Sequence, residues 1–399
     1  MSSPTTTLRR AGRGLLDLLT GPHGVDRYAE LIDPRLAADR HLAEVVAIEA
    51  ETPDTATLTL TPPKGWATGQ LPRPRHGQAV NLTVEVDGVR HTRSFSVASL
   101  TPTRWTITVR TNPTGTVSRF LVEDARPGLL VEVGAPFGAM VLPRDLTAQR
   151  ACEQAGSPHG MEAGLLFVSG GSGITPVMAM LRELRRAGRL VRHDARLAES
   201  PSLLPQVAFL HYARTPEDLI FAAELAELAD GFVNLDLVVV HTGDDAPVND
   251  RGLHGHFTPD HVAALDVDVS RAPTFACGPR GLTEAVRDWI GDETRLVVEH
   301  FQPPAIETDG DTPGGTLRFA TADVSTEADG RSILEQAEDA GLSPEHGCRI
   351  GICHSCVRPV TSGSVRDLLN GEVRTATDAA PVDTQLCISA AHGDCTVQL

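Results

Sequence analysis

Hydrophobic and polar residues alternate with a period of two between about residues 42 and 142. The clearest run is residues 80–86, where Val and Leu alternate with polar side chains, and the Asp87-Gly88 dipeptide that follows is a strong hairpin-turn signal. Two further runs show the same alternation. Several short antiparallel strands with regular turns predict a small antiparallel β-barrel over residues 42–150.

Between residues 164 and 301 the period changes, and continuous apolar strands alternate with amphipathic helices. LLFVS (165–169) is followed by GGSGITP, with Pro176 expected at the first helical position, and a later helix is predicted over residues 215–228. Strands that alternate with helices predict a parallel, doubly wound sheet that binds ligands at the carboxyl ends of its strands. We therefore expect a Rossmann-like α/β domain over residues 160–302.

The rest of the chain divides into an N-terminal extension, a linker and a last domain. Residues 1–41 contain a short amphipathic stretch, GLLDLLTG, which predicts a helix packed on the protein surface rather than a signal peptide or membrane span. A loop insertion is expected near 193–205. Residues 303–315 are rich in Pro, Gly and acidic residues, which is typical of a linker, and residues 316–399 form the last domain.

Charge and cysteine content narrow the classes of function. The net charge of −17 argues against nonspecific nucleic-acid binding and favours a partner with a basic docking face. Seven cysteines without a secretory signal indicate a reducing cytoplasm rather than a disulfide framework.

The cysteines of the last domain are spaced as in plant-type [2Fe–2S] ferredoxins. Cys348-x4-Cys353-x2-Cys356 is followed, after thirty intervening residues, by Cys387. Structural zinc is the alternative, but zinc sites usually combine two similarly spaced pairs, whereas three ligands here share one loop. The sequence therefore predicts a [2Fe–2S] cluster, with Cys395 outside the pattern on a strand.

The glycine-rich loop GGSGITP joins a predicted strand to a predicted helix. Glycines allow a phosphate to approach the backbone, and the helix N-terminus supplies N–H donors. A tight structural turn would explain the loop about as well. The CGP motif ends a later strand of the same sheet, so both motifs would line one crevice. The candidate nucleotide-binding residues are Gly170, Gly171, Gly173, Thr175, Pro176, Cys277, Gly278 and Pro279.

Arg214 follows the strand VAFLHYA and could reach the 2′-phosphate of a nucleotide. The alternative is an exposed arginine that pairs with Glu217 or Asp218. NADPH is therefore favoured only slightly over NADH.

Two segments of the predicted barrel suggest a phosphate-bearing planar ligand. RSFS (93–96) offers a guanidinium for a phosphate, an aromatic face and two hydroxyls. GTVSRFL (115–121) runs from a glycine turn into a probable helix, with Ser118 near its start, as a second candidate anion site.

Taken together, RSFS, GTVS, GGSGITP, CGP, EHF and the cysteine loop resemble the ferredoxin–NADP reductase superfamily, in the form that carries a C-terminal plant-type ferredoxin domain of β-grasp fold. The resemblance runs from about residue 42 to the end of the chain. It implies that a flavin, FAD rather than FMN, is held by the family's R-x-[YF]-S and G-x-[VI]-S motifs. These fall on Arg93, Ser94, Phe95, Ser96, Gly115, Val117 and Ser118, with Phe95 where Tyr is usual.

The same resemblance implies a catalytic set at the nucleotide crevice. Thr175 would lie near the flavin–nicotinamide contact, Cys277 beside the hydride path, and Phe301 at the family's E-x-F ending of the nucleotide domain.

The implied function is electron transfer from NAD(P)H through FAD and the cluster to an external oxygenase. VDRYAELIDP (25–34) resembles reductases that supply membrane fatty-acid desaturases or alkane hydroxylases. Two alternatives remain at this point: the reductase of a Rieske-type aromatic-ring dioxygenase, with the same three domains, and a non-enzymatic redox sensor with a degenerate flavin site.

Overall fold

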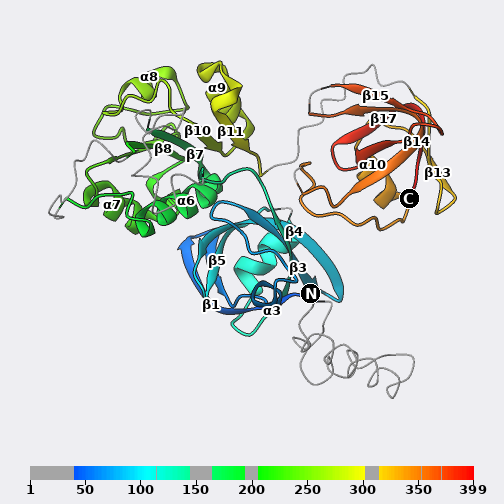
Figure 1. The fold of residues 1–399 in the computed structure, drawn as a ribbon, viewed down its shortest axis with the longest axis horizontal. Helices are drawn as coiled ribbons and strands as arrows, with labels where there is room; N and C mark the ends of the chain where they lie inside the picture. Colours follow the sequence, from blue (N-terminus) through cyan, green and yellow to red (C-terminus); the bar gives the residue numbers. More distant parts are fainter. Residues whose placement is uncertain are drawn as a thin grey trace, which may run out of the picture.

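Three sheets follow one another along the chain (Figure 1). The computed structural model describes residues 40–113, 115–143, 164–193, 205–301, 314–351, 353–369 and 371–399. The expectations for the N-terminal extension, the insertion near 193–205 and the linker lie wholly or mostly outside these residues.

The first sheet is a closed antiparallel barrel with strand order β1-β2-β5-β4-β3-β6. Alternate side chains of β3, such as Val80 and Leu82, are fully buried in the barrel core, as the period-two pattern predicts. Asp87 and Gly88 both have positive φ, 52° and 77°, which the tight β3–β4 hairpin requires. The strands are β1 (Leu42–Thr52), β2 (Thr55–Leu60), β3 (Ala79–Val86), β4 (Val89–Leu100), β5 (Trp105–Arg110) and β6 (Leu130–Phe137).

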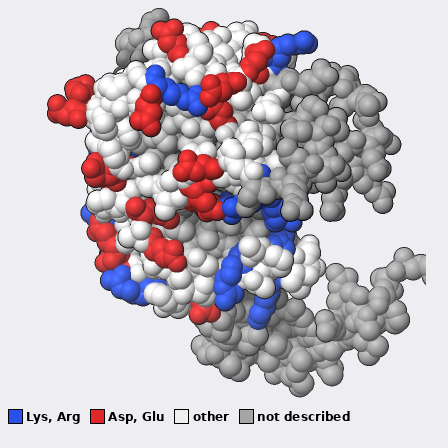
Figure 2. Space-filling model, turned by 90° about the vertical axis from the view of Figure 1, so that its left-hand side faces the viewer, with Lys and Arg blue, Asp and Glu red and all other residues white. Residues whose placement is uncertain are grey.

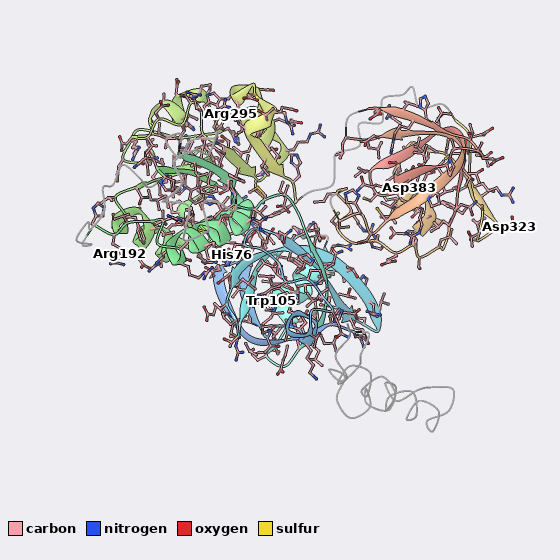
Figure 3. The ribbon with its side chains drawn as sticks, in the orientation of Figure 1. His76, Trp105, Arg192, Arg295, Asp323 and Asp383 are labelled. Atoms are coloured by element: carbon pink, nitrogen blue, oxygen red, sulfur yellow. The ribbon has the colours of Figure 1, made fainter. Side chains whose placement is uncertain are left out.

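Short helices close the barrel. Helix α3 (Lys64–Thr68) places Trp66 against Trp105, a residue buried within the barrel (Figure 3), with ring centroids 5.2 Å apart. Helix α4 (Thr116–Arg119) has only four residues and continues into a π-helical turn (Phe120–Asp124). The helix predicted at GTVSRFL therefore forms, with an irregular second turn.

The second sheet is parallel, in the order β11-β10-β7-β8-β9, with a buried apolar cluster on each face. This is the doubly wound sheet that the alternation of strands and helices predicts. Its strands are β7 (Leu165–Gly170), β8 (Val207–Ala213), β9 (Leu235–His241), β10 (Thr274–Cys277) and β11 (Leu296–Glu299). Its helices are α6 (Ile174–Arg186), α7 (Ala222–Gly231), α8 (Pro259–Ala263) and α9 (Arg280–Ile290).

Two helix predictions in this domain need correction, and one helix was missed. Helix α6 begins at Ile174, so Pro176 is its third residue, still within the first turn where its missing N–H costs no hydrogen bond. The helix predicted over residues 215–228 begins only at Ala222, because Phe221 has a left-handed backbone (φ 60°) after a short 3₁₀ turn. Helix α8 was not predicted.

The C-terminal sheet has the order β13-β12-β17-β14-β15, with β16 paired to β14, and β12 and β17 run parallel at its centre. The single helix described in this domain begins at a Ser332 cap, whose Oγ accepts the Glu335 backbone N–H. Cys395 lies buried on β17, as expected. The elements are β12 (Thr316–Phe319), β13 (Val324–Glu327), α10 (Ile333–Asp339), β14 (Val357–Asp367), β15 (Val373–Ala376), β16 (Val382–Gln385) and β17 (Ser389–Val397). An antiparallel barrel, an α/β domain and an α+β ferredoxin-like domain confirm the predicted fold class.

Helix α6 joins the parallel sheet to the barrel. Arg182 donates to the carbonyl of Ala98 on β4 at 2.7 Å. His76, which lies between the two domains in Figure 3, places Nε2 3.0 Å from the carboxylate of Glu183. Because Met140 also enters the apolar cluster under α6, the barrel and the α/β domain share part of one core.

Candidate active site and metal centre

The glycine loop and the CGP motif meet at the carboxyl ends of β7 and β10. A Cβ atom at Gly173 would overlap the carbonyl oxygen of Cys277, so only glycine permits this approach. A Cβ atom at Gly170 would lie 2.9 Å from the Leu282 side chain and 3.1 Å from the ring of Pro279, so this glycine also packs closely against the CGP segment. Gly171 has φ +53° within the 3₁₀ turn that leads into α6. The structure thus brings together the two motifs that the sequence analysis placed in one crevice.

A row of polar side chains crosses the sheet at this edge. Glu299, Cys277, Ser169 and His211 are register neighbours on β11, β10, β7 and β8. Ser169 Oγ lies 2.8 Å from His211 Nδ1. Burial, with a smaller effect from Glu299, raises the pKa of Cys277 well above its ordinary value, so the thiol stays protonated.

The sequence analysis did not single out Ser169, His211 or Glu299 of this row, and Glu299 has the most unusual surroundings of the three. Its side chain is buried, and neither carboxylate oxygen has a hydrogen-bond partner within the described part of the chain. Burial raises its pKa to about 8. The EHF motif carries the sequence signal, a carboxylate at the end of an apolar strand; Phe301, the aromatic residue of the same motif, is half-buried against the α6 core. A perturbed carboxyl in a crevice is typical of functional sites.

Thr175 is almost completely buried in the first turn of α6. Its Oγ1 donates to the carbonyl of Ser172 at 3.0 Å, so its hydroxyl stabilises the glycine loop.

Arg214 lies just beyond β8 and is mostly exposed, with 69% of its side chain accessible. Its Nε donates to Asp218 at 3.0 Å. Asp218 also accepts from Arg110, which pairs with Asp54 at 2.7 Å. The ion pair considered in the sequence analysis therefore forms, although the guanidinium keeps an open face toward solvent.

The RSFS motif lies along β4. Ser96 is buried, and its hydroxyl has no hydrogen-bond partner among the residues described, so a bound ligand would satisfy it. Burial lowers the pKa of Arg93 slightly from its very high ordinary value, and the side chain donates to the carbonyl of Thr92. Phe95 packs against the barrel core. A half-buried cation and an unsatisfied hydroxyl on one strand fit an anionic, polar cofactor.

The Gly115 turn lies beside this strand, because α4 packs against β3, β4 and β5. Val117 is buried, and Ser118 Oγ accepts the backbone N–H of Asn112 at 3.0 Å. The anion site expected at Ser118 stays a prediction. This hydroxyl is engaged within its own loop, and α4 is too short to present a full turn of N–H donors.

The cysteine loop curls tightly before β14. Arg349, Gly351 and His354 all have positive φ, of 60°, 83° and 56°. This curl aims backbone N–H groups at sulfur: Cys348 N donates to Cys353 Sγ at 3.2 Å, and Cys353 N donates to Cys348 Sγ at 3.4 Å.

The four sulfurs lie as two pairs. Hydrogen bonding with Cys348 lowers the pKa of the Cys353 thiol to about 4, and hydrogen bonding with Cys387 lowers the pKa of Cys356 to about 7. Cys356 and Cys387 Sγ are 3.3 Å apart. Within the described ranges no group of three or more ligating side chains surrounds a single ion position. Two cysteine pairs fit a cluster with two irons, each bound by two cysteines, better than one tetrahedral zinc.

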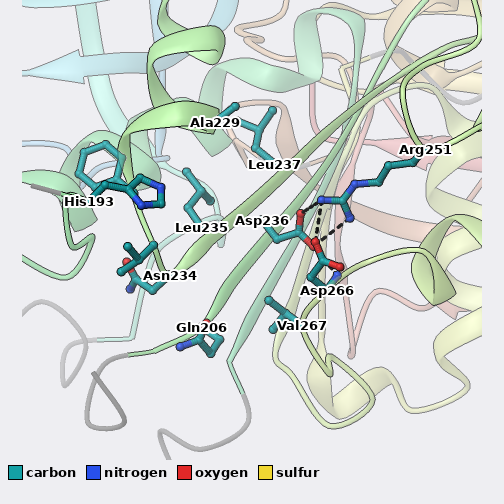
Figure 4. A pocket seen from close by; sticks show the side chains of 12 residues that line it. His193, Gln206, Ala229, Asn234, Leu235, Asp236, Leu237, Arg251, Asp266 and Val267 are labelled. Atoms are coloured by element: carbon teal, nitrogen blue, oxygen red, sulfur yellow. Dashed lines mark hydrogen bonds and ion pairs between the residues drawn. The ribbon is translucent and has the colours of Figure 1, made fainter. Parts of the chain in front are cut away.

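A separate hollow lies at the opposite edge of the parallel sheet (Figure 4). It is lined by residues at the starts of β8 and β9, including Gln206 and Asp236. Arg251 pairs there with Asp236 at 2.5 Å and with Asp266 at 3.0 Å. Because ligands of such sheets bind at the carboxyl ends of the strands, this hollow is no part of the candidate active site.

No helix in the part of the chain that the structure describes is long and apolar enough to cross a membrane.

Comparison with known proteins agrees with this geometry. Residues 167–288 match the family model of the oxidoreductase NAD-binding domain, and residues 320–392 match that of the 2Fe-2S iron-sulfur cluster binding domain. An NADPH oxidoreductase of Mycobacterium tuberculosis is 32% identical over 390 residues, covering 96% of this chain and 90% of that protein. The glycine betaine monooxygenase reductase subunit of Pseudomonas aeruginosa is 26% identical over 90% of this chain and 96% of its own length.

A solved structure of phthalate dioxygenase reductase shares the fold, with a TM-score of 0.56 and 23% identity over 92% of this chain and 99% of that one. The chain therefore belongs to the ferredoxin–NADP reductase superfamily, as an oxidoreductase with a domain for a nicotinamide nucleotide and a C-terminal ferredoxin domain for a [2Fe–2S] cluster.

Proposed function

We propose that this protein takes electrons from NADPH or NADH and delivers them one at a time to an external oxygenase. The observation that carries the proposal is the convergence of the predicted motifs: the glycine loop meets CGP, and the cysteine loop touches β3 beside RSFS, through the Asn81–Ser355 hydrogen bond. Bound FAD would convert the two-electron hydride into the single electrons that a [2Fe–2S] cluster accepts.

The chain's own residues supply binding and positioning. Arg93, Ser94, Phe95 and Ser96 on β4, with Gly115, Val117 and Ser118 beside them, would hold the flavin. The loop Gly170–Pro176 and the CGP motif would hold the nicotinamide nucleotide, with Thr175, Cys277 and Phe301 closest to the reacting ring. Four cysteines, Cys348, Cys353, Cys356 and Cys387, would hold the cluster.

We also propose that each domain binds one cofactor. Residues 42–150 would bind the flavin, residues 160–302 the nicotinamide nucleotide, and residues 316–399 the cluster. The linker over residues 303–315 joins the last two units. This division is supported by the buried core that each of the three sheets possesses.

The proposed acceptor is a membrane fatty-acid desaturase or hydroxylase, reached from the cytoplasm, because VDRYAELIDP resembles reductases of that group. A Rieske-type dioxygenase is the alternative, and the monooxygenase reductase subunits among the relatives support an oxygenase partner in general. Figure 2 shows acidic side chains over much of one face and Lys and Arg side chains gathered toward its lower right, and the net charge of −17 supports a basic docking face on the acceptor in either case.

The test is an anaerobic absorbance titration with NADPH and, separately, NADH. We expect the flavin bands and then the cluster shoulder to bleach with about stoichiometric nucleotide. A protein that binds nucleotide without bleaching would be a redox sensor rather than a reductase. Turnover with membranes that contain a desaturase, compared with a purified Rieske oxygenase, then identifies the acceptor class, and a variant lacking residues 1–41 tests whether that segment selects it.

A further inference from the structure

One side chain joins the flavin strand to the cysteine loop. Asn81 on β3 donates through Nδ2 to Ser355 Oγ at 3.3 Å, and its Oδ1 accepts from Ser94 Oγ at 2.6 Å. Asn81 and Ser94 are register partners on neighbouring barrel strands. Ser355 lies 274 positions further along the chain, between two of the cluster cysteines. A hydrogen-bonded bridge thus connects the RSFS motif with the cluster loop.

The bridge continues to the cluster ligand itself. Ser355 lies two residues after the ligand Cys353, and its side chain and backbone both contribute to lowering the pKa of the Cys353 thiol. The groups around ligand sulfurs tune the electronic properties of a cluster. Asn81, which holds Ser355 in place, can therefore influence the cluster indirectly.

Gly347 packs against the same Asn81 side chain. A Cβ atom at Gly347 would overlap Asn81 Nδ2 and lie 2.8 Å from its Cγ, and its three nearest atoms would all belong to Asn81. Gly347 is buried, and its φ lies outside the left-handed region, so its backbone would accept alanine. The glycine is therefore needed for the contact between the two domains rather than for the local conformation of the loop.

A charged contact lies beside this packing. Arg349 of the cysteine loop is held by Glu338 through two hydrogen bonds of 3.0 and 2.5 Å. Arg93 of RSFS lies within electrostatic range of both side chains. Burial lowers the pKa of Arg93, the positive charge of Arg349 lowers it further, and the negative charge of Glu338 raises it. The Glu338 carboxylate thus offsets part of the repulsion between the guanidinium groups of Arg93 and Arg349.

We propose that Asn81 is the positioning residue that docks the ferredoxin domain on the barrel, through the Ser94–Asn81–Ser355 bridge and the close contact with Gly347. This inference rests on the proposed function, because docking at this place matters only if electrons pass from the flavin to the cluster. The contact holds the cluster loop against the strand that carries the flavin motif, and electron transfer requires such a short separation.

The experiment uses the full-length holoprotein and four variants. Asn81→Ala removes the hydrogen-bonded bridge. Gly347→Ala adds a methyl group that clashes with the Asn81 side chain, and the double variant carries both changes. Thr83→Ala is the matched control, because Thr83 is the next outward residue of β3 and its hydroxyl pairs with Thr92 on the neighbouring strand β4, at 2.7 Å. Iron content is measured first, so that variants without a cluster are recognised.

Two readouts are compared. Hydrogen–deuterium exchange in the oxidised protein, without nucleotide, reports protection of residues 79–86 and 346–356. Stopped-flow absorbance separates flavin reduction by NADPH from the later reduction of the cluster. We expect Asn81→Ala and Gly347→Ala to raise exchange in both segments and to slow cluster reduction about tenfold, the effect of losing one hydrogen bond and its packing. Flavin reduction should keep its wild-type rate.

The double variant discriminates between docking and local damage. Once the Asn81 side chain is shortened to alanine, the methyl group added by Gly347→Ala has room, so the double variant should be no slower than Asn81→Ala alone. Additive slowing, unchanged exchange in Gly347→Ala, or an equal effect of Thr83→Ala would overturn the docking role. If NADPH reduces neither centre of the wild type, the proposed function fails, whereas the exchange data still decide whether Asn81 docks the domain.

Discussion

Replacing Glu299 by glutamine should remove a pH-dependent loss of stability. Glu299 is only 4% exposed, and burial raises its pKa to about 8 from an ordinary value of 4.5. In the unfolded chain the same carboxyl ionises near its ordinary value. Between these two pKa values the unfolded state releases a proton that the folded state keeps, so the free energy of unfolding falls as the pH rises.

The size of the effect follows from the two pKa values. The stabilising contribution is complete below pH 4.5, and it is lost as the pH rises through the folded pKa of about 8. Each pH unit in this window lowers the free energy of unfolding by about 1.4 kcal/mol, which amounts to about 3 kcal/mol by pH 7. Glutamine has no ionisable group, so Glu299→Gln should lack this slope.

The assay is calorimetric unfolding at pH 5, 6, 7 and 8. The transition of the nucleotide-binding domain is recognised by its shift to higher temperature with NADP⁺. Glu293→Gln is the control, because it removes the same charge from a side chain that is 76% exposed. The reasoning is refuted if Glu299→Gln and the wild type lose stability in parallel across this range, since Glu299 would then be ionised in the folded protein.

Three further predictions concern the nucleotide and cluster sites. Gly173→Ala should weaken NADP⁺ binding about tenfold or more in titration calorimetry, because its Cβ would overlap the Cys277 carbonyl, whereas Gly281→Ala, which meets no atom within 4 Å, should bind normally. Cys387→Ser should lose the cluster, measured as bound iron and by electron paramagnetic resonance of the reduced protein, whereas Cys395→Ser should keep it. Arg214→Ser should raise KM for NADPH about tenfold and leave KM for NADH unchanged; equal changes for both nucleotides would contradict a 2′-phosphate contact.

The local pattern of the chain predicted much of the architecture. The period-two runs gave the barrel strands, and Asp87-Gly88 gave the hairpin, because side-chain alternation and turn preference depend on near neighbours. Helix starts were less accurate: α7 begins after Phe221, whose left-handed backbone reflects its burial in the core under α6 rather than its local sequence.

The cysteine spacing determined the nature of the cluster by itself, because four thiols with that spacing in one loop and one later position suit two irons. Only the tertiary structure determined the charges and contacts that surround the cofactor sites. Glu299 is an ordinary carboxylate in sequence and becomes a raised-pKa group only because the barrel and β10 cover it. Asn81 is one polar residue of an alternating strand, and its contact with Ser355 exists only where two domains, far apart in the chain, pack together. Burial and long-range packing depend on distant residues, and no local pattern records them.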